Sequence, residues 1–391
     1  MEMNYVIDTF FAIFSMTLII LMVPGFAMLE AGLVRTKNVT SVLTVNVMIY
    51  AIASISFMLI GYEYAFGSWD HQTGISKYAF FLFQMAFVGK VVNIMSGGVS
   101  ERSRILPLAL FTVAVGAFLY PTIVNITWGA NFLAGTAFDI SAMSDLAGGT
   151  VIHSTGGWAL LAAILIMGSR RGRYRKNGAI QVIPASNIPL VTLGAFLLWI
   201  GWFGFNGGSV GAISSKENAD AVALTIMNTN TAGLSGAIIG WLLTYFRYKK
   251  FDITMMLNGA LGGLVAVTAG PDQYDIYTPI LIGAIGGALV VIFVPIFDKL
   301  KMDDPVGALS VHLVNGIWGT LAVAIFVPEV HMMDQVKGIV VVAAIVFPLS
   351  YAIIYIINKI FTLKASDDEQ LEGIDAIECG IESYPEFKRS I

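Results

Sequence analysis

Two histidines inside long apolar segments are the residues of this chain whose chemistry stands out. His153 lies in the stretch LAGGTVIHSTGGWALL and His312 in VGALSVHLVNGIWGTL, and each is followed four residues later by a glycine and then by a tryptophan. A polar imidazole is costly to place in hydrocarbon, so a histidine inside a membrane predicts a functional site. Two unrelated histidines, each hydrogen-bonded between packed helices, are the alternative. The matching surroundings favour a duplicated membrane protein with a polar pair at its centre.

The composition places most of the chain in a lipid bilayer. Of its 391 residues, 57% are hydrophobic and only 12% are charged, whereas a soluble domain carries about 25% charged residues. The single cysteine, Cys379, excludes an intrachain disulfide and a metal site built from several thiolates. The sequence contains no metal-ligand cluster, nucleotide-binding loop or pair of nucleophile and base. It therefore predicts no enzyme activity, no cofactor, no metal and no nucleic-acid partner.

About eleven segments are long enough to cross a bilayer, for which roughly 20 apolar residues are needed. Because every backbone polar group must be satisfied in lipid, segments of this length are predicted to be helices. The acidic N-terminus, MEMNYVID, runs directly into the first segment, which predicts a retained helix rather than a signal peptide. The segments are residues 6–33, 40–66, 78–99, 105–126, 146–168, 188–210, 219–246, 253–270, 277–297, 305–327 and 336–362.

Basic residues are concentrated in one of the two sets of loops. The loops after odd-numbered segments hold Arg35, Lys37, Arg102, Arg104, Arg170, Arg171, Arg173, Arg175, Lys176, Arg247, Lys249, Lys250, Lys299 and Lys301. The other loops hold only Lys77, Lys216 and Lys337. By the positive-inside rule, the odd segments end in the cytoplasm, so the N-terminus is predicted outside and the C-terminus inside.

Five segments in each half predict that the second half is inverted relative to the first, with the eleventh helix outside the repeat. Inverted repeats place their key site near the middle of the membrane. His153 lies eight residues after Asp145, at the outer end of the fifth segment, and His312 lies eight residues after Asp304, at the inner end of the tenth. Eight helical residues span about 12 Å of a core of about 30 Å, so the two imidazoles are expected close to its middle.

The stretches around these residues resemble the ammonium transporter (Amt/Rh) family, on its Amt side. The resemblance covers essentially the whole chain in family order, and it implies a trimer of eleven-helix protomers with one pore in each. The matching stretches are MVPGFAMLEAGLVRTKN (22–38), FQMAF (83–87), GGVSERSR (97–104), DLAGGTVIHSTGG (145–157), WIGWFGFNGGS (199–209), NGALGGLVAVTAG (258–270), DDPVGALSVHLVNGIWGTL (303–321) and EGIDAIECG (372–380).

The resemblance implies an outer site for ammonium formed by Trp128, Phe83 and Ser209, with Asp145 beneath it. Cation–π attraction at such a site is worth about 0.5–2 kcal/mol, which is weak enough for a conducted ion to leave. An interfacial tryptophan is the ordinary role of Trp128. A helix N-cap is the ordinary role of Asp145, and we expect it in addition to the role in the site.

Below this site, Phe87 and Phe205 resemble the family's paired phenylalanine gate, although ordinary packing is the alternative in a chain with 25 phenylalanines. His153 and His312 would then line a dry passage. A shared N–H···N bond would fix complementary tautomers, and the pair would titrate as a unit. Because an unpaired cation is costly in low dielectric, we expect capture of ammonium outside, loss of a proton near the gate, and passage of ammonia past the histidines.

The third segment departs from the family at Lys90 and Asn93, where relatives carry small or apolar residues or threonine. Lys90 lies three residues after Phe87, on the same helix face, and about 15 Å from either end of its helix, too deep to reach water comfortably. At this depth a charged lysine needs a partner or water, or it must become neutral. A protonated Lys90 in the pore would oppose ammonium below the gate yet spare ammonia, or it would reduce conduction altogether. A silent pairing with a neighbouring helix or protomer is the alternative. Thr268 matches a pore-side threonine of the family, but a helix-packing threonine is as good an interpretation.

Three glutamates, Glu30, Glu63 and Glu101, are predicted to be structural. Glu30 and Glu101 lie near inner helix ends, close in sequence to arginines such as Arg35. This placement predicts local ion pairing or helix capping.

Residues 1–364 are predicted to form the membrane domain and residues 365–391 a polar, acidic cytoplasmic tail. The tail's resemblance implies binding of a PII-type nitrogen-signalling protein, although Cys379 and Ile381 stand where relatives commonly carry histidine and glutamate. The predicted function is ammonium/ammonia transport for nitrogen uptake by a multi-pass homotrimer of the cell membrane. The alternative is an Amt-like ammonium sensor that conducts little, and Lys90 in the pore region is the residue that suggests it. A channel for another small neutral solute is a third option, which the outer aromatic and acidic cluster disfavours.

Overall fold

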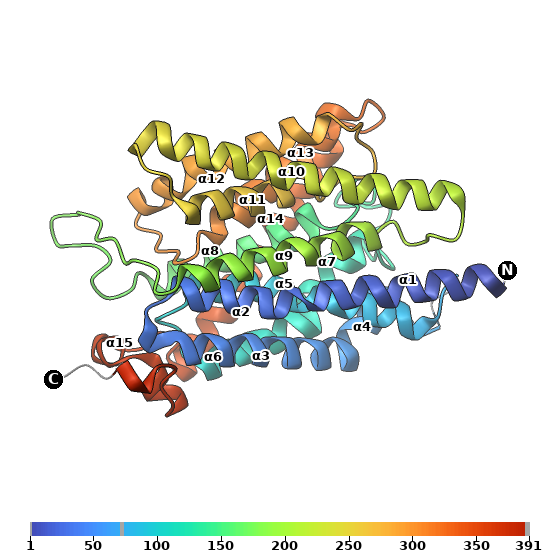
Figure 1. Ribbon diagram of the computed structural model, residues 1–391. Helices are drawn as coiled ribbons and strands as arrows, with labels where there is room; N and C mark the ends of the chain where they lie inside the picture. Colours follow the sequence, from blue (N-terminus) through green and yellow to red (C-terminus); the bar gives the residue numbers. More distant parts are fainter. Residues whose placement is uncertain (1, 71–73, 388–391) are drawn as a thin grey trace.

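The computed structural model describes residues 2–70 and 74–387 and is a bundle of long helices that run roughly along one direction (Figure 1). In chain order, the elements of the first half are α1 Glu2–Ile20, α2 Met22–Leu33, η1 Thr36–Asn38, α3 Val39–Ser56, η2 Phe57–Gly61, α4 Tyr62–Phe66, α5 Lys77–Val99, α6 Ile105–Ala114, η3 Val115–Leu119, α7 Tyr120–Thr127, η4 Gly149–Ser154 and α8 Thr155–Met167. Those of the second half are α9 Ile188–Gly208, α10 Lys216–Tyr248, α11 Ile253–Val267, α12 Thr278–Lys299, η5 Leu309–Val314, α13 Asn315–Phe326, α14 Met332–Phe361, α15 Asp367–Glu372, η6 Asp375–Cys379 and η7 Pro385–Phe387.

Within the described residues, ten helical stretches are long and apolar enough to cross a membrane. An eleventh helix, Ile253–Val267, lies where the eighth crossing was expected but is shorter, with 15 residues. The all-helical membrane architecture is therefore confirmed, whereas the count of eleven crossings stays a prediction. The two chain ends lie at opposite ends of the bundle, as an odd number of crossings requires (Figure 1). Which end faces the cytoplasm stays a prediction.

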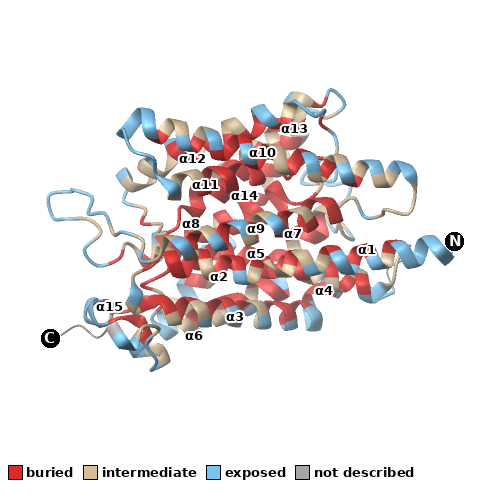
Figure 2. Ribbon diagram, viewed as in Figure 1, coloured by how far each residue is buried: buried red, intermediate tan, exposed pale blue. Residues whose placement is uncertain are grey.

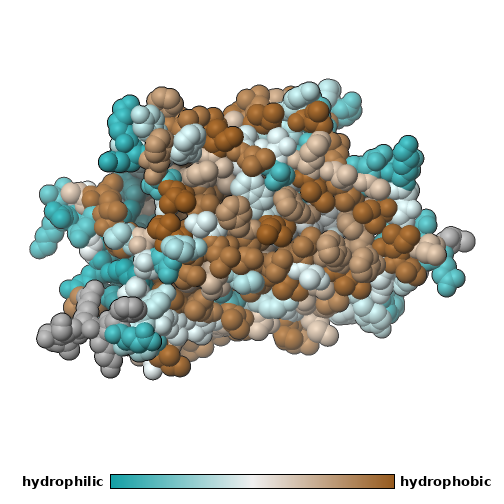
Figure 3. Space-filling view, in the orientation of Figure 1, coloured by the Kyte–Doolittle hydropathy of each residue, from teal (hydrophilic) through white to brown (hydrophobic). Residues whose placement is uncertain are grey.

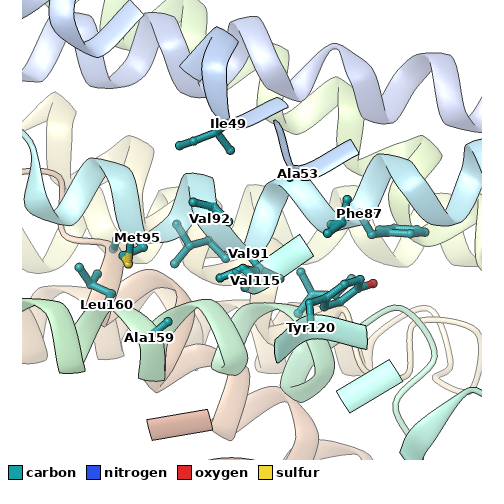
Figure 4. Close-up of a cluster of buried hydrophobic side chains, with 14 of the residues drawn as sticks. Ile49, Ala53, Phe87, Val91, Val92, Met95, Val115, Tyr120, Ala159 and Leu160 are labelled. Atoms are coloured by element: carbon teal, nitrogen blue, oxygen red, sulfur yellow. The ribbon is translucent and has the colours of Figure 1, made fainter. Parts of the chain in front are cut away.

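The face of the bundle seen in Figure 3 is apolar along its middle and polar at both ends, the distribution that a bilayer requires. Figure 3 shows hydrophobic side chains over the middle of the visible face and hydrophilic ones at the two ends. Buried residues fill the interior of the bundle (Figure 2). At the centre is α5, in which every residue from Ala86 to Val99 is buried. Figure 4 shows Val91 and Val92 of this helix packed among side chains of neighbouring helices.

One end of the bundle is held together by a buried cluster of charges from three loops. The Arg170 guanidinium pairs with Glu101 at 2.6 Å and with Asp303 at 2.8 Å. Arg35 also pairs with Glu101, at 2.9 Å, so the ion pairing expected of Glu101 is confirmed. Burial by itself raises the pKa of Glu101 and of Asp303, but the arginines outweigh it. They lower the pKa of Glu101 and hold that of Asp303 at about 2.

The tail docks on the helix ends beside this cluster. The Asp375 carboxylate accepts the backbone N–H groups of Thr40 and Ser41, at the first turn of α3, at 2.9 and 2.7 Å. The Glu378 carboxylate accepts the N–H of Ile105, the first residue of α6, at 3.1 Å. Each carboxylate occupies the positive end of a helix, where anions are stabilised. The acidic tail is thus positioned by specific contacts with the helix ends.

Candidate functional site

The two histidines meet in the interior of the bundle. His153 Nδ1 and His312 Nδ1 are 3.1 Å apart, and the rings are nearly parallel, with centroids 5.2 Å apart and an interplanar angle of 17°. The residues are 3% and 5% exposed. Since a nitrogen–nitrogen hydrogen bond needs one donor and one acceptor, one ring carries the proton at Nδ1 and the other does not. The predicted contact between the imidazoles is therefore present.

The same local structure positions both rings. His153 lies in the π-helical segment η4 and His312 in the π-helical segment η5. In each half an aspartate precedes the histidine by eight residues and accepts backbone N–H groups of the following turn. Asp145 accepts those of residues 148–151 at 2.7–3.0 Å, and Asp304 accepts those of residues 306, 307 and 309 at 2.7–3.3 Å. A glycine with positive φ follows each aspartate by three residues, at 101° for Gly148 and 81° for Gly307. The duplicated motif therefore includes the backbone, and single-turn π segments are common at functional sites.

The glycine four residues after each histidine lets the two helices cross closely. A Cβ atom on Gly157 would lie 2.6 Å from Cβ and 2.9 Å from the backbone N of Leu313. A Cβ atom on Gly316 would lie 3.0 Å from the backbone N of Ser154. Any side chain at these positions would force the helices apart. The repeated glycine of the sequence is thus what allows the two rings to reach each other.

Aromatic rings continue from the histidine pair in one direction. The His153 ring stacks on Trp202 and Phe205, with centroids 5.1 and 5.5 Å apart. Phe205 meets Phe87 edge to face at 4.7 Å, and Phe87 meets Phe83 edge to face at 4.9 Å. Phe87 and Phe205 are buried. The structure thus brings the two predicted gate residues into contact with each other and Phe205 into contact with His153.

The residues expected at the outer site come from four parts of the chain. Trp128 follows α7, Phe83 lies in α5, Asp145 precedes η4 and Ser209 follows α9. The Trp128 indole N–H donates to the Asp145 carbonyl oxygen at 2.9 Å, which fixes its ring against the turn that Asp145 caps. Burial raises the pKa of Asp145 to about 6, although its four backbone hydrogen bonds act in the opposite direction. The Ser209 hydroxyl donates to the Phe205 carbonyl at 2.8 Å, which leaves its oxygen free to accept. A Cβ on the neighbouring Gly208 would lie 2.6 Å from the Phe83 ring.

Lys90 and Asn93 both lie inside the protein. Lys90 is 1% exposed, and its Nζ has no hydrogen-bond partner among the residues that the structure covers. The silent pairing with a neighbouring helix is therefore not observed, and a second protomer cannot reach a group buried within the first. Asn93 donates to Asn46 Oδ1 at 2.8 Å, while its own Oδ1 is buried without a partner. Thr268 accepts the Trp202 indole N–H at 2.9 Å, so it holds the ring that stacks on His153.

A small cavity lies on the His312 side of the histidine pair. His312, Trp202, Asn93 and Asn258 line it together with Glu30. The ion pairing expected of Glu30 was wrong. Its carboxylate accepts from Asn46 at 3.1 Å and from Ser96 at 3.0 Å, both neutral donors, and it is 1% exposed. Sequence position alone misled the prediction, because Glu30 lies only five residues from Arg35 but turns to the interior of the bundle.

Comparison with known proteins gives one consistent result. The model of the Ammonium Transporter Family matches residues 10–384. The ammonium transporter Amt2 of Archaeoglobus fulgidus is 31% identical over 419 residues, covering 97% of this chain and 89% of the relative. The ammonium transporter Amt1 of Methanocaldococcus jannaschii is 33% identical, covering 97% of each.

Solved structures share the fold. A protein described as a Sensor Amt Protein superposes with a TM-score of 0.90 at 32% identity, covering 97% of this chain and 100% of its own. Mep2 of Saccharomyces cerevisiae superposes with a TM-score of 0.82 at 25% identity, covering 93% of this chain and 90% of its own.

Proposed function

The chain belongs to the ammonium transporter family, and we propose that it carries ammonium nitrogen across the cell membrane through the passage that contains the histidine pair. The observation that carries this proposal is the buried contact of His153 with His312 directly beside the Phe87–Phe205 pair. Two hydrogen-bonding imidazoles next to a pair of buried phenylalanine rings suit a small polar molecule that has lost its hydration shell. The family is one of transporters, and we propose no enzymatic step.

Recruitment begins at the outer end, where Trp128, Phe83 and Ser209 bind the ammonium ion. The aromatic faces attract the cation, and the Ser209 hydroxyl oxygen accepts one of its N–H groups. Asp145 holds the turn beneath them, because both of its oxygens are engaged by backbone N–H groups.

The Phe87–Phe205 pair then separates the outer site from the histidines. Edge-to-face rings offer no hydrogen bonds to replace the hydration of an ion, so passage of the charged form is costly there. Ammonium gives one proton to water on the outer side of this pair, and ammonia passes on as a neutral molecule. The imidazole pair offers it donors and acceptors where water is scarce.

A second candidate function is that of an ammonium sensor that conducts little. Two observations favour it. Lys90 lies one helical turn from Phe87 with its amino group buried and without a partner in the described structure, and in its protonated form this group opposes entry of another cation. The structural similarity to a protein described as a Sensor Amt Protein supports this alternative.

Uptake of methylammonium by vesicles containing the reconstituted protein separates the two functions. Transport predicts uptake by the unmodified protein. The sensor predicts little uptake, restored by Lys90→Ala. Lys77→Ala is the matched control, because Lys77 is a half-exposed lysine at the start of the same helix. Absence of uptake from both the unmodified protein and Lys90→Ala would refute conduction.

We extend the proposal to assembly and regulation. The chain forms homotrimers in the cell membrane, and a PII-type protein binds the cytoplasmic end where the tail docks. Mass measurement of the detergent-solubilised complex and co-purification with a PII protein test these two statements separately.

A further inference from the structure

The turn that carries Asp145 is bound to α14, the helix that follows both histidine segments. Gln335, in the first turn of α14, is fully buried. Its Oε1 accepts the backbone N–H of Ser144 at 2.7 Å, and its Nε2 donates to the Ser144 carbonyl oxygen at 2.8 Å. A side-chain amide thus pairs with both backbone groups of the residue that precedes Asp145. Because hydrogen bonds are directional, two of them fix the orientation of this segment as well as its position.

The same amide reaches α13, the helix that continues from the second histidine. Gln335 Nε2 also donates to the carbonyl oxygen of Thr320 at 2.7 Å. The Thr320 hydroxyl shares a hydrogen bond of 2.7 Å with the hydroxyl of Thr150, whose backbone N–H donates to Asp145 at 2.8 Å. These bonds use both N–H donors of the glutamine amide and its oxygen. Gln335 is therefore connected to Asp145 by two routes, through Ser144 and through Thr320.

The surface of α14 is shaped for this contact. Gly338 lies three residues after Gln335, on the same face of the helix. A Cβ atom on Gly338 would lie 3.0 Å from Cβ of Met143, which leaves no room for a methyl group unless Met143 shifts. The glycine therefore lets residues 143 and 144 lie directly against α14, within reach of the glutamine amide.

The hydrogen bonds of Gln335 bear on the Trp128 ring through one peptide group. The Trp128 indole N–H donates to the carbonyl oxygen of Asp145 at 2.9 Å, so the ring follows any movement of this carbonyl. On the far side of Asp145, the backbone N–H of Leu146 donates to the carbonyl oxygen of Ala269 at 2.8 Å. The peptide that holds the ring is thus fixed from both sides, and Gln335 supplies the attachment on the side that precedes Asp145.

We propose that Gln335 is a positioning residue of the outer ammonium site, which holds the Trp128 ring in place without touching the ion. This inference rests on the proposed function, because that function defines the outer site. Cation–π attraction requires the cation to lie within about 6 Å of the ring centroid, so a ring that can shift binds the ion less well. The hydrogen bonds of Gln335 end on Ser144 and Thr320 rather than on the gate or the histidine pair. Its loss therefore changes affinity and leaves the later steps intact.

Initial rates of methylammonium uptake by reconstituted vesicles, measured over a range of concentrations, test this role. Gln335→Met keeps an unbranched side chain of similar length and removes the three hydrogen bonds. We expect KM to rise about two- to thirtyfold, which corresponds to the loss of a cation–π contact of about 0.5–2 kcal/mol, with an unchanged maximal rate. A purely structural role would lower the maximal rate instead, because fewer molecules would be folded.

Gln273→Met is the matched control. Gln273 is an exposed glutamine that donates to the hydroxyl of the same Ser144, at 3.1 Å, rather than to its backbone. We expect this variant to keep the KM of the unmodified protein. An equal rise of KM in both variants would overturn the proposal, since any contact with Ser144 would then have the same effect.

A double-mutant cycle with Trp128→Ala tests whether Gln335 acts through the ring. Trp128→Ala raises KM by itself, and adding Gln335→Met raises it no further, because both changes remove the same interaction. Independent rises that multiply in the double variant would refute the proposal, as would an unchanged KM in folded Gln335→Met. If Gln335→Met is not recovered as folded protein, Gly338→Ala takes its place, because its methyl group displaces Met143 from α14 and raises KM in the same way.

Calorimetric titration of the same proteins with ammonium chloride distinguishes failure of this role from failure of the proposed function. Uptake with a KM that ignores Gln335→Met refutes the positioning role alone. A binding event that depends on Trp128, in a protein without uptake, refutes transport, and Gln335→Met then weakens that event by the factor expected for KM. Absence of both uptake and a Trp128-dependent event refutes the outer site and the positioning role with it.

Discussion

At the level of single residues, the contact between His153 and His312 restricts what each ring can do. Two imidazolium rings would place N–H against N–H at a separation of 3.1 Å, so at least one ring stays neutral. His153 Nε2 is buried without a partner in the described part of the chain, which leaves His312 as the ring that faces open space. The two histidines are therefore equivalent in the sequence pattern but different in their surroundings.

This contact predicts the effect of removing one ring. His312→Ala lowers methylammonium uptake by about tenfold or more, because a lost buried hydrogen-bonding pair costs about 1–3 kcal/mol and 1.4 kcal/mol is a factor of ten. Uptake by reconstituted vesicles is the measurement, with the exposed His331→Ala as the control. Equal uptake by both variants would show that the pair is not on the path.

At the level of elements, the crossing of the two histidine helices depends on glycine. Gly157→Ala places a methyl group 2.6 Å from Leu313 Cβ, which should destabilise the protein by about 1–3 kcal/mol through overpacking and separate the rings. Gly89→Ala is the matched control, because its new Cβ would have ordinary contacts, the nearest at 3.9 Å. Thermal unfolding and uptake check both variants. A Gly157→Ala protein as stable and active as Gly89→Ala would contradict the close crossing.

The tail is an element whose position depends on two carboxylates. Asp375→Asn weakens the hydrogen bonds that cap the start of α3. Loss of a helix cap costs about 0.5–2 kcal/mol, so this substitution should release the tail. Limited proteolysis measures the release as faster cleavage after residue 365. Asp368→Asn provides the comparison, because Asp368 lies exposed in the same segment. Equal cleavage rates in the two variants would argue against docking through Asp375.

At the level of the whole molecule, the cluster of Arg170, Glu101 and Asp303 joins loops that are distant in sequence, and it makes stability depend on pH. The folded protein holds the pKa of Asp303 at about 2 and lowers that of Glu101. The ordinary carboxyl values are about 4, so the contribution of these groups is complete above that pH and is lost as the pH falls toward 2.

Thermal unfolding measured between pH 6 and about pH 2 should therefore show a steep loss of stability toward acid. Asp303→Asn should lower the stability at neutral pH by about 3–5 kcal/mol, since it leaves Arg170 with less compensation, and should flatten the acid slope. The exposed Asp220→Asn should follow the unmodified protein. A slope that is identical in all three proteins would remove the cluster as its cause.

The sequence was most informative where a pattern recurs. The paired histidines, their glycines and the apolar segments are periodic or duplicated, and the helical membrane fold follows from them. Glu30 could not be placed this way, because a glutamate one turn from a helix end can face either an arginine or the interior. The π-helical segments around both histidines also leave no signal in residue type, since they arise from how the helices pack.

The crossing at Gly157 and Gly316 has a consequence for the speed of the passage. Close contacts with the partner helix at these two glycines fix the spacing of the histidine helices in the proposed passage, and main-chain atoms cannot swing aside as a side chain does. In the proposed gate, rotation of the Phe87 and Phe205 rings would then admit each molecule without displacement of whole helices. We therefore expect that the turnover rate is not limited by rigid-body motion of domains, which takes microseconds to milliseconds.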